Sequence, residues 1–306
     1  MRLRLGRPDL ARYADRFDVP RADGDFAVTF LGVSTLLLDD GETSVMTDGY
    51  FSRPSLAKVG LGKVAPDHAR IDAALARTGT TRLQGVLPVH THVDHALDSA
   101  VIADRTGALL VGGESVANVG RGGGLPDERL RVVTSGESLR LGGFDLTWIE
   151  SDHCPPDRFP GPITQPVVPP AKARTYRCGE AWSLLVSHTS GRTALIQGSA
   201  GFMAGALSGH RADVAYLGVG QLGLQDEDYI RTYWAETVQT VGAKIVVLIH
   251  WDDFFRSLDE PLRALPYAGD DLDVTMRIFE ELAADQAVEL HFPTVWQRED
   301  PWASLL

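Results

Sequence analysis

Three histidines and one aspartate occur within six residues, in the segment LPVHTHVDHALD. They are His90, His92, Asp94 and His95. Imidazole nitrogens and carboxylate oxygens are the usual donors to a zinc ion, so the segment predicts a metal site. In an extended backbone, residues i, i+2 and i+4 point the same way, so His90, His92 and Asp94 are expected to converge. His95 then points elsewhere, which suits a second metal better than a fourth ligand on the first.

Three further polar residues stand where predicted strands end. Asp48 ends SVMTD, His153 follows FDLTWIES, and His250 follows KIVVLI. Side chains at strand ends project into the loops where functional sites are built. A lone histidine in such a place is more often structural, but the nearby cluster favours a role for these two as metal ligands. Since a catalytic zinc site needs three protein ligands and one open position, His153 and His250 would complete two such sets.

The elements that must position these residues are many short strands, first in hairpins and then alternating with helices. Strands are expected at 26–31, 34–38, 44–48, 83–89, 108–111, 130–133, 144–150, 182–187, 193–197, 214–219 and 244–250. Helices are expected at 96–106, 226–240 and 271–284. This order favours two sheets with helices packed outside them. No linker divides the chain, so a single domain over 1–306 is expected, with a proline-rich loop at about 154–177.

The composition limits the classes of protein and partner. With 306 residues, of which 44% are hydrophobic, the chain is long enough for a large core. The two cysteines cannot form a disulfide framework, and no apolar run approaches the length of a membrane span. We therefore expect a cytoplasmic protein without an integral membrane segment. The net charge of −12 argues against a nucleic acid partner and leaves a small molecule as the expected one. A homo-oligomer is left open.

The motif HTHVDH at 90–95, with Asp48 before it and single histidines at 153 and 250 after it, resembles the metallo-β-lactamase fold superfamily. The resemblance extends from about residue 26 to residue 250. It implies an α/β (α+β) fold, a four-layer αββα sandwich with the metal site at one edge. It further implies two ligand sets and one supporting carboxylate: His90, His92 and His153 for the first metal, Asp94, His95 and His250 for the second, and Asp48 behind a ligand histidine.

The sequence departs from the resemblance at one position. Many hydrolases of the superfamily carry a bridging aspartate after a strand, where this chain has TALIQ followed by Gly198-Ser199-Ala200. A neutral hydroxyl is a poor metal ligand and supplies no negative charge between two dications. Ser199 is therefore expected beside the site, which holds one or two ions.

The chemistry that the resemblance implies is hydrolysis of an ester-like bond by a metal-activated hydroxide. Zn²⁺ is the expected metal, with Mn²⁺ and Fe²⁺ as alternatives. Asp94, placed between ligand histidines, is expected to orient the hydroxide and to transfer a proton. Two other classes stay open, namely an iron-dependent oxidoreductase of the same fold and a non-catalytic metal-binding protein.

The segments ADVAYLGVG and IHWDDF resemble the branch that includes L-ascorbate-6-phosphate lactonase and N-acylphosphatidylethanolamine phospholipase D. This resemblance implies a small anionic substrate that carries a lactone or phosphodiester bond. The proline-rich loop begins next to His153 and is placed to form a wall or lid over the metals. Substrate contacts are expected from Lys172, Arg174, Arg177 and Trp251. The alternative is an exposed loop with solvated charges.

Overall fold

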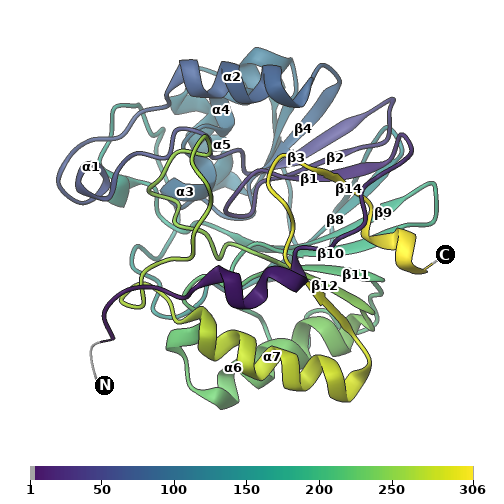
Figure 1. Cartoon of the computed structure of the whole chain (residues 1–306). Helices are drawn as coiled ribbons and strands as arrows, with labels where there is room; N and C mark the ends of the chain where they lie inside the picture. The colour runs from purple at the N-terminus through teal and green to yellow at the C-terminus, as the bar shows by residue number, and fades with distance from the viewer. Residues whose placement is uncertain (1–3, 306) are drawn as a thin grey trace.

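The apolar strand patterns form two seven-stranded sheets that pack face to face, as the computed structural model of residues 4–305 shows (Figure 1). The first sheet has the order β14-β1-β2-β3-β4-β5-β6 and the second β13-β12-β11-β10-β9-β8-β7. The strands of the first sheet are β1 (Ala27–Phe30), β2 (Leu36–Asp39), β3 (Ser44–Thr47), β4 (Leu83–Leu87), β5 (Leu109–Gly112), β6 (Leu130–Val132) and β14 (Arg298–Glu299). Those of the second are β7 (Ser138–Leu141), β8 (Phe144–Ser151), β9 (Ala181–His188), β10 (Thr193–Gln197), β11 (Val214–Gly218), β12 (Ile245–Ile249) and β13 (Glu289–His291).

Helices cover the outer faces of both sheets (Figure 1). On the first sheet lie α2 (His68–Thr78), α4 (Ser99–Thr106) and α5 (Glu114–Gly122), and on the second lie α6 (Glu227–Trp234) and α7 (Leu272–Gln286). Two short helices, α1 (Leu56–Leu61) and α3 (Val93–Ala96), flank the edge where the sequence places its histidines. The remaining helical segments are 3₁₀ or π turns: Leu10–Arg16, Asp127–Arg129, Ala173–Thr175, Leu222–Leu224, Ala235–Gln239 and Pro301–Leu305.

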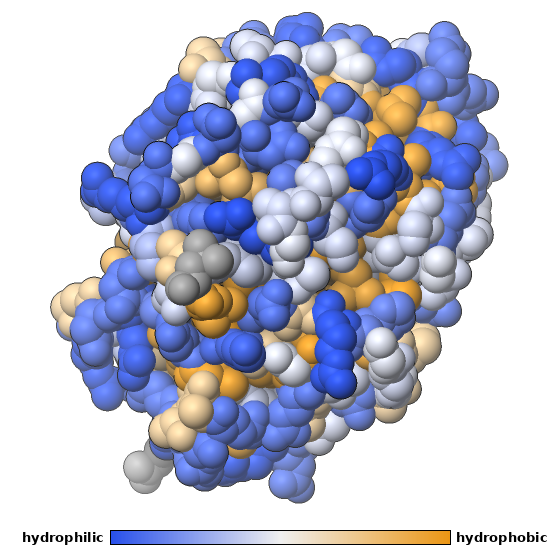
Figure 2. Space-filling model, turned by 90° about the vertical axis from the view of Figure 1, so that its right-hand side faces the viewer, coloured by the Kyte–Doolittle hydropathy of each residue, from blue (hydrophilic) through white to orange (hydrophobic). Residues whose placement is uncertain are grey.

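The main core lies between the sheets. Trp148 of β8 and Val247 of β12 are buried there. Every residue of β12 is buried, because the first sheet covers one face of this parallel strand and α6 and α7 cover the other (Figure 1). Truncating such a side chain to alanine costs about 2–5 kcal/mol of stability. The face shown in Figure 2 is mainly hydrophilic, with hydrophobic areas scattered among polar ones. Within residues 4–305 no helix combines the length and the apolar character that a bilayer span requires.

The expected four-layer αββα architecture is confirmed. The ends of the predicted 1–306 domain, residues 1–3 and 306, lie outside the described residues. The local prediction around the histidines is wrong in one respect. The segment is not extended from His90 to Asp94, because β4 ends at Leu87 and α3 begins at Val93. The predicted helix over 96–106 is accordingly two helices, α3 and α4, with a turn between them.

Candidate metal centre

Parallel strands bring the polar side chains to one edge. Asp48 and the 88–92 segment follow β3 and β4, which are parallel neighbours, so both lie at the same end of the first sheet. In the second sheet β8 and β10 both run antiparallel to β9, and β10, β11 and β12 are parallel. His153 after β8 and His250 after β12 therefore share one end of that sheet. The two ends meet at the histidine cluster.

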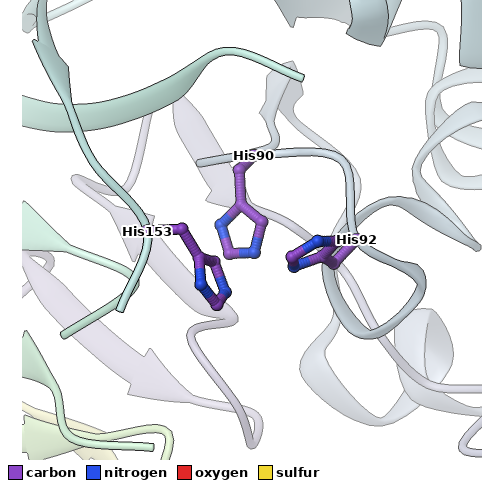
Figure 3. Close-up of side chains that lie close together, drawn as sticks. All are labelled: His90, His92 and His153. Carbon is purple, nitrogen blue, oxygen red and sulfur yellow. The ribbon is translucent and has the colours of Figure 1, made fainter. Parts of the chain in front are cut away.

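His90, His92 and His153 form the first triad, with potential ligand atoms within 4.8 Å of one another. Their rings gather around a common point (Figure 3), and the ring centroids are 4.6–4.9 Å apart. His90 Nε2 is buried and has no hydrogen-bond partner among the described residues. His153 donates from Nδ1 to the carbonyl oxygen of Cys154 at 2.7 Å, which leaves Nε2 free to bind a metal.

The protonation state of the first triad suits the binding of a cation. Burial, followed by the neighbouring histidines, lowers the pKa of His90 well below its usual range. Burial, followed by His92, lowers the pKa of His153 to about 4. Both rings are therefore neutral at pH 7, which is the protonation state that metal ligation requires.

Asp94, His95 and His250 form the second triad. His95 Nε2 and His250 Nε2 are 3.2 Å apart, and Asp94 Oδ2 lies 3.6 Å from the former and 3.4 Å from the latter. With metal–nitrogen bonds of 2.0–2.1 Å, two tetrahedral ligands stand about 3.3 Å apart. The three donor atoms thus already have the spacing that a single zinc ion requires. Asp94 belongs to this triad rather than to that of His90 and His92, because it lies on α3.

Asp48 fixes the orientation of His95. Its Oδ2 accepts a hydrogen bond from His95 Nδ1 at 2.8 Å, and its Oδ1 accepts from the backbone N–H of Val89 at 2.9 Å. Since the carboxylate can only accept, Nδ1 carries the proton and Nε2 is left for a metal. The same carboxylate therefore connects the second triad to the loop that carries the first.

The backbone around the centre is strained. Val33, Asp48 and His250 have φ values of 53°, 53° and 59°, which is unusual for a β-branched residue such as Val33. The Val33 carbonyl accepts from His250 N–H at 2.6 Å, and Val33 N–H donates to Asp252 Oδ1 at 2.8 Å. Asp252 in turn pairs with Arg53 in a fully buried ion pair. Such strain costs on the order of 1–3 kcal/mol per residue and is typical of functional sites.

Ser199 lies beside the first triad and binds the backbone that follows His153. Its Oγ accepts a hydrogen bond from the N–H of Cys154 at 3.0 Å, immediately after His153. The hydroxyl is thus used to hold the His153 segment. Among the six clustered ligands only Asp94 is an acid, so the centre offers one negative charge to a pair of dications.

Both triads open into a cavity of about 940 Å³. His92, Asp94, His153 and His250 line it, and so do two of the expected substrate contacts, Lys172 and Arg174. Arg177 does not line this cavity; its backbone carbonyl accepts from Thr91 Oγ1 at 2.5 Å. Nor does Trp251, which is 1% exposed.

The expectation for Trp251 needs correction. Its indole lies in the core against Phe17, Phe30 and Phe292. Phe254 and Phe255, which follow on the turn after β12, do line the cavity. A side chain directly after a buried strand can point to the core, and here it does.

Several lining residues were missed from the sequence. Asp157, Arg158 and Phe159 lie early in the proline-rich loop, close to His92 or in the cavity wall. Helix α1 supplies Leu56 and Leu61, both exposed, at the mouth. The sequence offered a signal for the loop residues, because they follow the predicted ligand His153 within six positions. Nothing in the 56–61 segment marks it as part of a site.

Comparison with curated proteins gives one partial match. No model of a known protein family matches the chain. A protein described as a UPF0173 metal-dependent hydrolase, from Christiangramia forsetii, is 32% identical over 91 residues, which is 30% of this chain and 34% of that protein. The match thus spans about a third of the relative's length.

Solved structures match nearly the whole chain. Igni18, a metallo hydrolase from Ignicoccus hospitalis, is 14% identical with a TM-score of 0.54, over 90% of this chain and 96% of that one. CmlA, a diiron β-hydroxylase from Streptomyces venezuelae, is 12% identical with a TM-score of 0.53, over 90% of this chain and 54% of that one. At such identities the likeness shows a common fold.

Proposed function

We propose that the chain is a metal-dependent hydrolase of the metallo-β-lactamase type, because its two sheets form an αββα sandwich and a metallo hydrolase shares this fold. The observation that carries the proposal is the spacing of the second triad, whose three donor distances of 3.2, 3.4 and 3.6 Å fit one ion. Proteins described as metal-dependent or metallo hydrolases share sequence with part of the chain or share its fold, which supports the same reading.

The donor set favours the binding of one or two Zn²⁺ ions. Five imidazoles and one carboxylate are ligands that zinc accepts readily. A bound ion would lower the pKa of a water molecule to about 7 and polarise the bond under attack. With Ser199 in place of a bridging acid, the second ion is held by less negative charge than a bridged pair would have.

Asp94 is the proposed catalytic residue. Burial by itself would raise the pKa of its carboxyl, but His95 and a hydrogen bond from His250 lower this pKa well below the usual range. The ionised carboxylate lines the cavity, where it can orient an attacking water and accept its proton. Hydrolysis that persists in Asp94→Ala at unchanged metal content would contradict this role.

The cavity favours a small anionic substrate with a lactone or phosphodiester bond. Six basic side chains line it, namely Arg7, Arg158, Lys172, Arg174, Arg256 and Arg263. Arg7 and Arg263 pair with Asp253, and Arg256 pairs with Glu260. Within residues 4–305, Arg158, Lys172 and Arg174 have no acidic partner at ion-pair distance. In a chain of net charge −12, this local excess of positive charge would attract an anion.

An iron-dependent oxidoreductase is the second candidate, because the diiron enzyme CmlA has the same fold. Its metal would distinguish it from a zinc hydrolase. The absence of an acid at Ser199 weighs against an iron pair, since bridged iron sites rely on carboxylate oxygen.

Elemental analysis of protein purified without added metal tests both candidates. We expect one or two equivalents of zinc or manganese in the wild type and a loss of metal in His90→Ala. His68→Ala, which removes an exposed histidine that belongs to neither triad, is the matched control. The metal-loaded protein is then assayed on lactones and phosphodiesters. Iron as the bound metal would favour the oxidoreductase, and no metal after reconstitution would overturn the hydrolase proposal.

A further inference from the structure

We propose that Asp157, in the proline-rich loop, is a positioning residue that holds His92 by its Nε2 so that Nδ1 faces the first metal ion. The inference rests on the proposed function, because it requires that the first triad bind a metal. It assigns a role to a residue that the motif does not include.

The contact between the two side chains supports this role. His92 Nε2 lies 3.2 Å from Asp157 Oδ1, and their side chains are 11% and 21% exposed. The nitrogen is buried and makes no well-aligned hydrogen bond to any described residue, so the carboxylate is its natural acceptor. At 3.2 Å the two atoms are within hydrogen-bond distance. Because a carboxylate only accepts, Nε2 would then carry the proton and Nδ1 the free lone pair.

Two of the other candidate ligand histidines are held in the same manner. His95 donates from Nδ1 to Asp48, and His153 donates from Nδ1 to the carbonyl of Cys154. A metal-bound imidazole usually has such an acceptor on its second nitrogen, which fixes the ring and raises its basicity. Asp157 would give the first ion the charged support that Asp48 gives the second. It would also bring a negative charge close to a centre that lacks one at Ser199.

The loop holds Asp157 in place. Asp157 Oδ1 accepts from the N–H of Phe159 at 2.9 Å, which closes a local turn. The N–H of Cys178 donates to the Phe159 carbonyl at 2.8 Å, and that of Gly179 donates to the Gly161 carbonyl at 3.1 Å. These bonds tie the start of the loop to its end, so the carboxylate has a defined position beside His92.

A separate metal site is the competing explanation, because His92, Asp157 and Cys178 also lie within 4.8 Å of one another. To serve as a ligand Cys178 must lose its proton. Its sulfur is buried, and the acids nearest to it are Asp157, Asp152 and Glu180. A thiolate there would be repelled by these carboxylates, whereas a thiol can donate to Asp157. The cluster is therefore better explained as an orienting chain that ends on His92.

Metal affinity, measured by competition with a chromophoric chelator, tests the proposal. Asp157→Ala and Asp157→Asn are each introduced into two backgrounds, the wild type and His250→Ala. In the second background only the first triad is complete. We expect Asp157→Ala to weaken Zn²⁺ binding by about 10–100-fold in both backgrounds. Asp157→Asn should lose less Zn²⁺ affinity, because its amide oxygen still accepts a hydrogen bond. The absorption spectrum of the Co²⁺ form should shift in Asp157→Ala, since His92 would no longer be held in one orientation.

Asp104→Asn, which neutralises an exposed carboxylate on α4, is the matched control. Thermal unfolding of the metal-free proteins shows whether each variant is folded. Unchanged Zn²⁺ affinity and an unchanged Co²⁺ spectrum in a folded Asp157→Ala would overturn the role of Asp157 and leave the proposed function standing. A wild type that binds no metal would overturn both, so the two failures are distinguishable. Loss of binding in Asp157→Ala equal to that in Cys178→Ser would instead favour the separate site and contradict the proposal.

Discussion

His95 and Asp48 are joined by a buried hydrogen bond of 2.8 Å, although 47 positions separate them in the chain. The bond exists because β3 and β4 are parallel neighbours, so residues that follow them reach the same edge. It sets the tautomer of His95 and directs Nε2 toward Asp94 and His250. The sheet register, rather than proximity in sequence, thus prepares the second triad.

Asp48→Ala should weaken the second metal site. Its loss leaves His95 Nδ1 and the N–H of Val89 without their acceptor, so the ring can turn. We expect about a 10–100-fold lower affinity for one zinc equivalent, measured by chelator competition. Asp48→Asn should retain more affinity, because asparagine tolerates the φ of 53° and keeps an acceptor. Equal affinity in Asp48→Ala and the wild type would show that the bond has no role in metal binding.

Ser199→Asp should increase the metal content. A carboxylate can still accept from the N–H of Cys154, as the hydroxyl does at 3.0 Å, and it adds a negative charge beside the first triad. We expect the variant to retain closer to two zinc equivalents after dialysis, where the wild type retains fewer. Ser199→Ala is the control, since it adds no charge and costs one hydrogen bond, worth about 1 kcal/mol of stability. A lower zinc content in Ser199→Asp than in Ser199→Ala would refute the charge argument.

Glu299→Gln should make stability less dependent on pH. Burial raises the pKa of Glu299 to about 8, despite hydrogen bonds from Thr294 and Gln297 that lower it. Between the unfolded pKa of about 4.5 and pH 8, the folded state therefore holds a proton that the unfolded state releases. Stability from this group is present below pH 4.5 and is lost as the pH rises through 8.

Urea unfolding of the metal-free protein at pH 5 and pH 9 measures the effect. We expect the wild type to lose on the order of 4 kcal/mol more unfolding free energy than Glu299→Gln over this range. Glu42→Gln, on the surface, should behave like the wild type. Identical pH dependence in wild type and Glu299→Gln would mean that Glu299 is already ionised in the folded protein.

The sequence was sufficient for the architecture and for the six ligands that come together, because each follows a strand or lies in one compact motif. His153 and His250 were found from the apolar runs before them. Their division into triads came from the family resemblance. The extended-backbone argument would have placed Asp94 with His90 and His92, because it did not foresee that a helix begins at Val93.

What the sequence did not predict depends on tertiary contacts. Asp157 meets His92 only because the proline-rich loop is tied back to Cys178 and Gly179. Trp251 points to the core, while Phe254 reaches the cavity, and this depends on how the chain turns after β12. A side chain's direction in a loop is set by such contacts, which no local pattern records.

Lys172→Ala and Arg174→Ala should weaken binding of anions in the cavity. Both side chains line it, and neither pairs with an acid within residues 4–305. Each free cation near a bound anion, in a partly screened site, is worth about 1 kcal/mol, so we expect inorganic phosphate to bind the metal-loaded variants about 5-fold more weakly. Titration calorimetry at two salt concentrations measures this, and the difference from wild type should shrink at the higher salt because screening reduces it. Lys244→Ala removes an exposed cation beside β12 and is the control. Phosphate affinity that is the same in all three variants would favour solvated charges over substrate contacts.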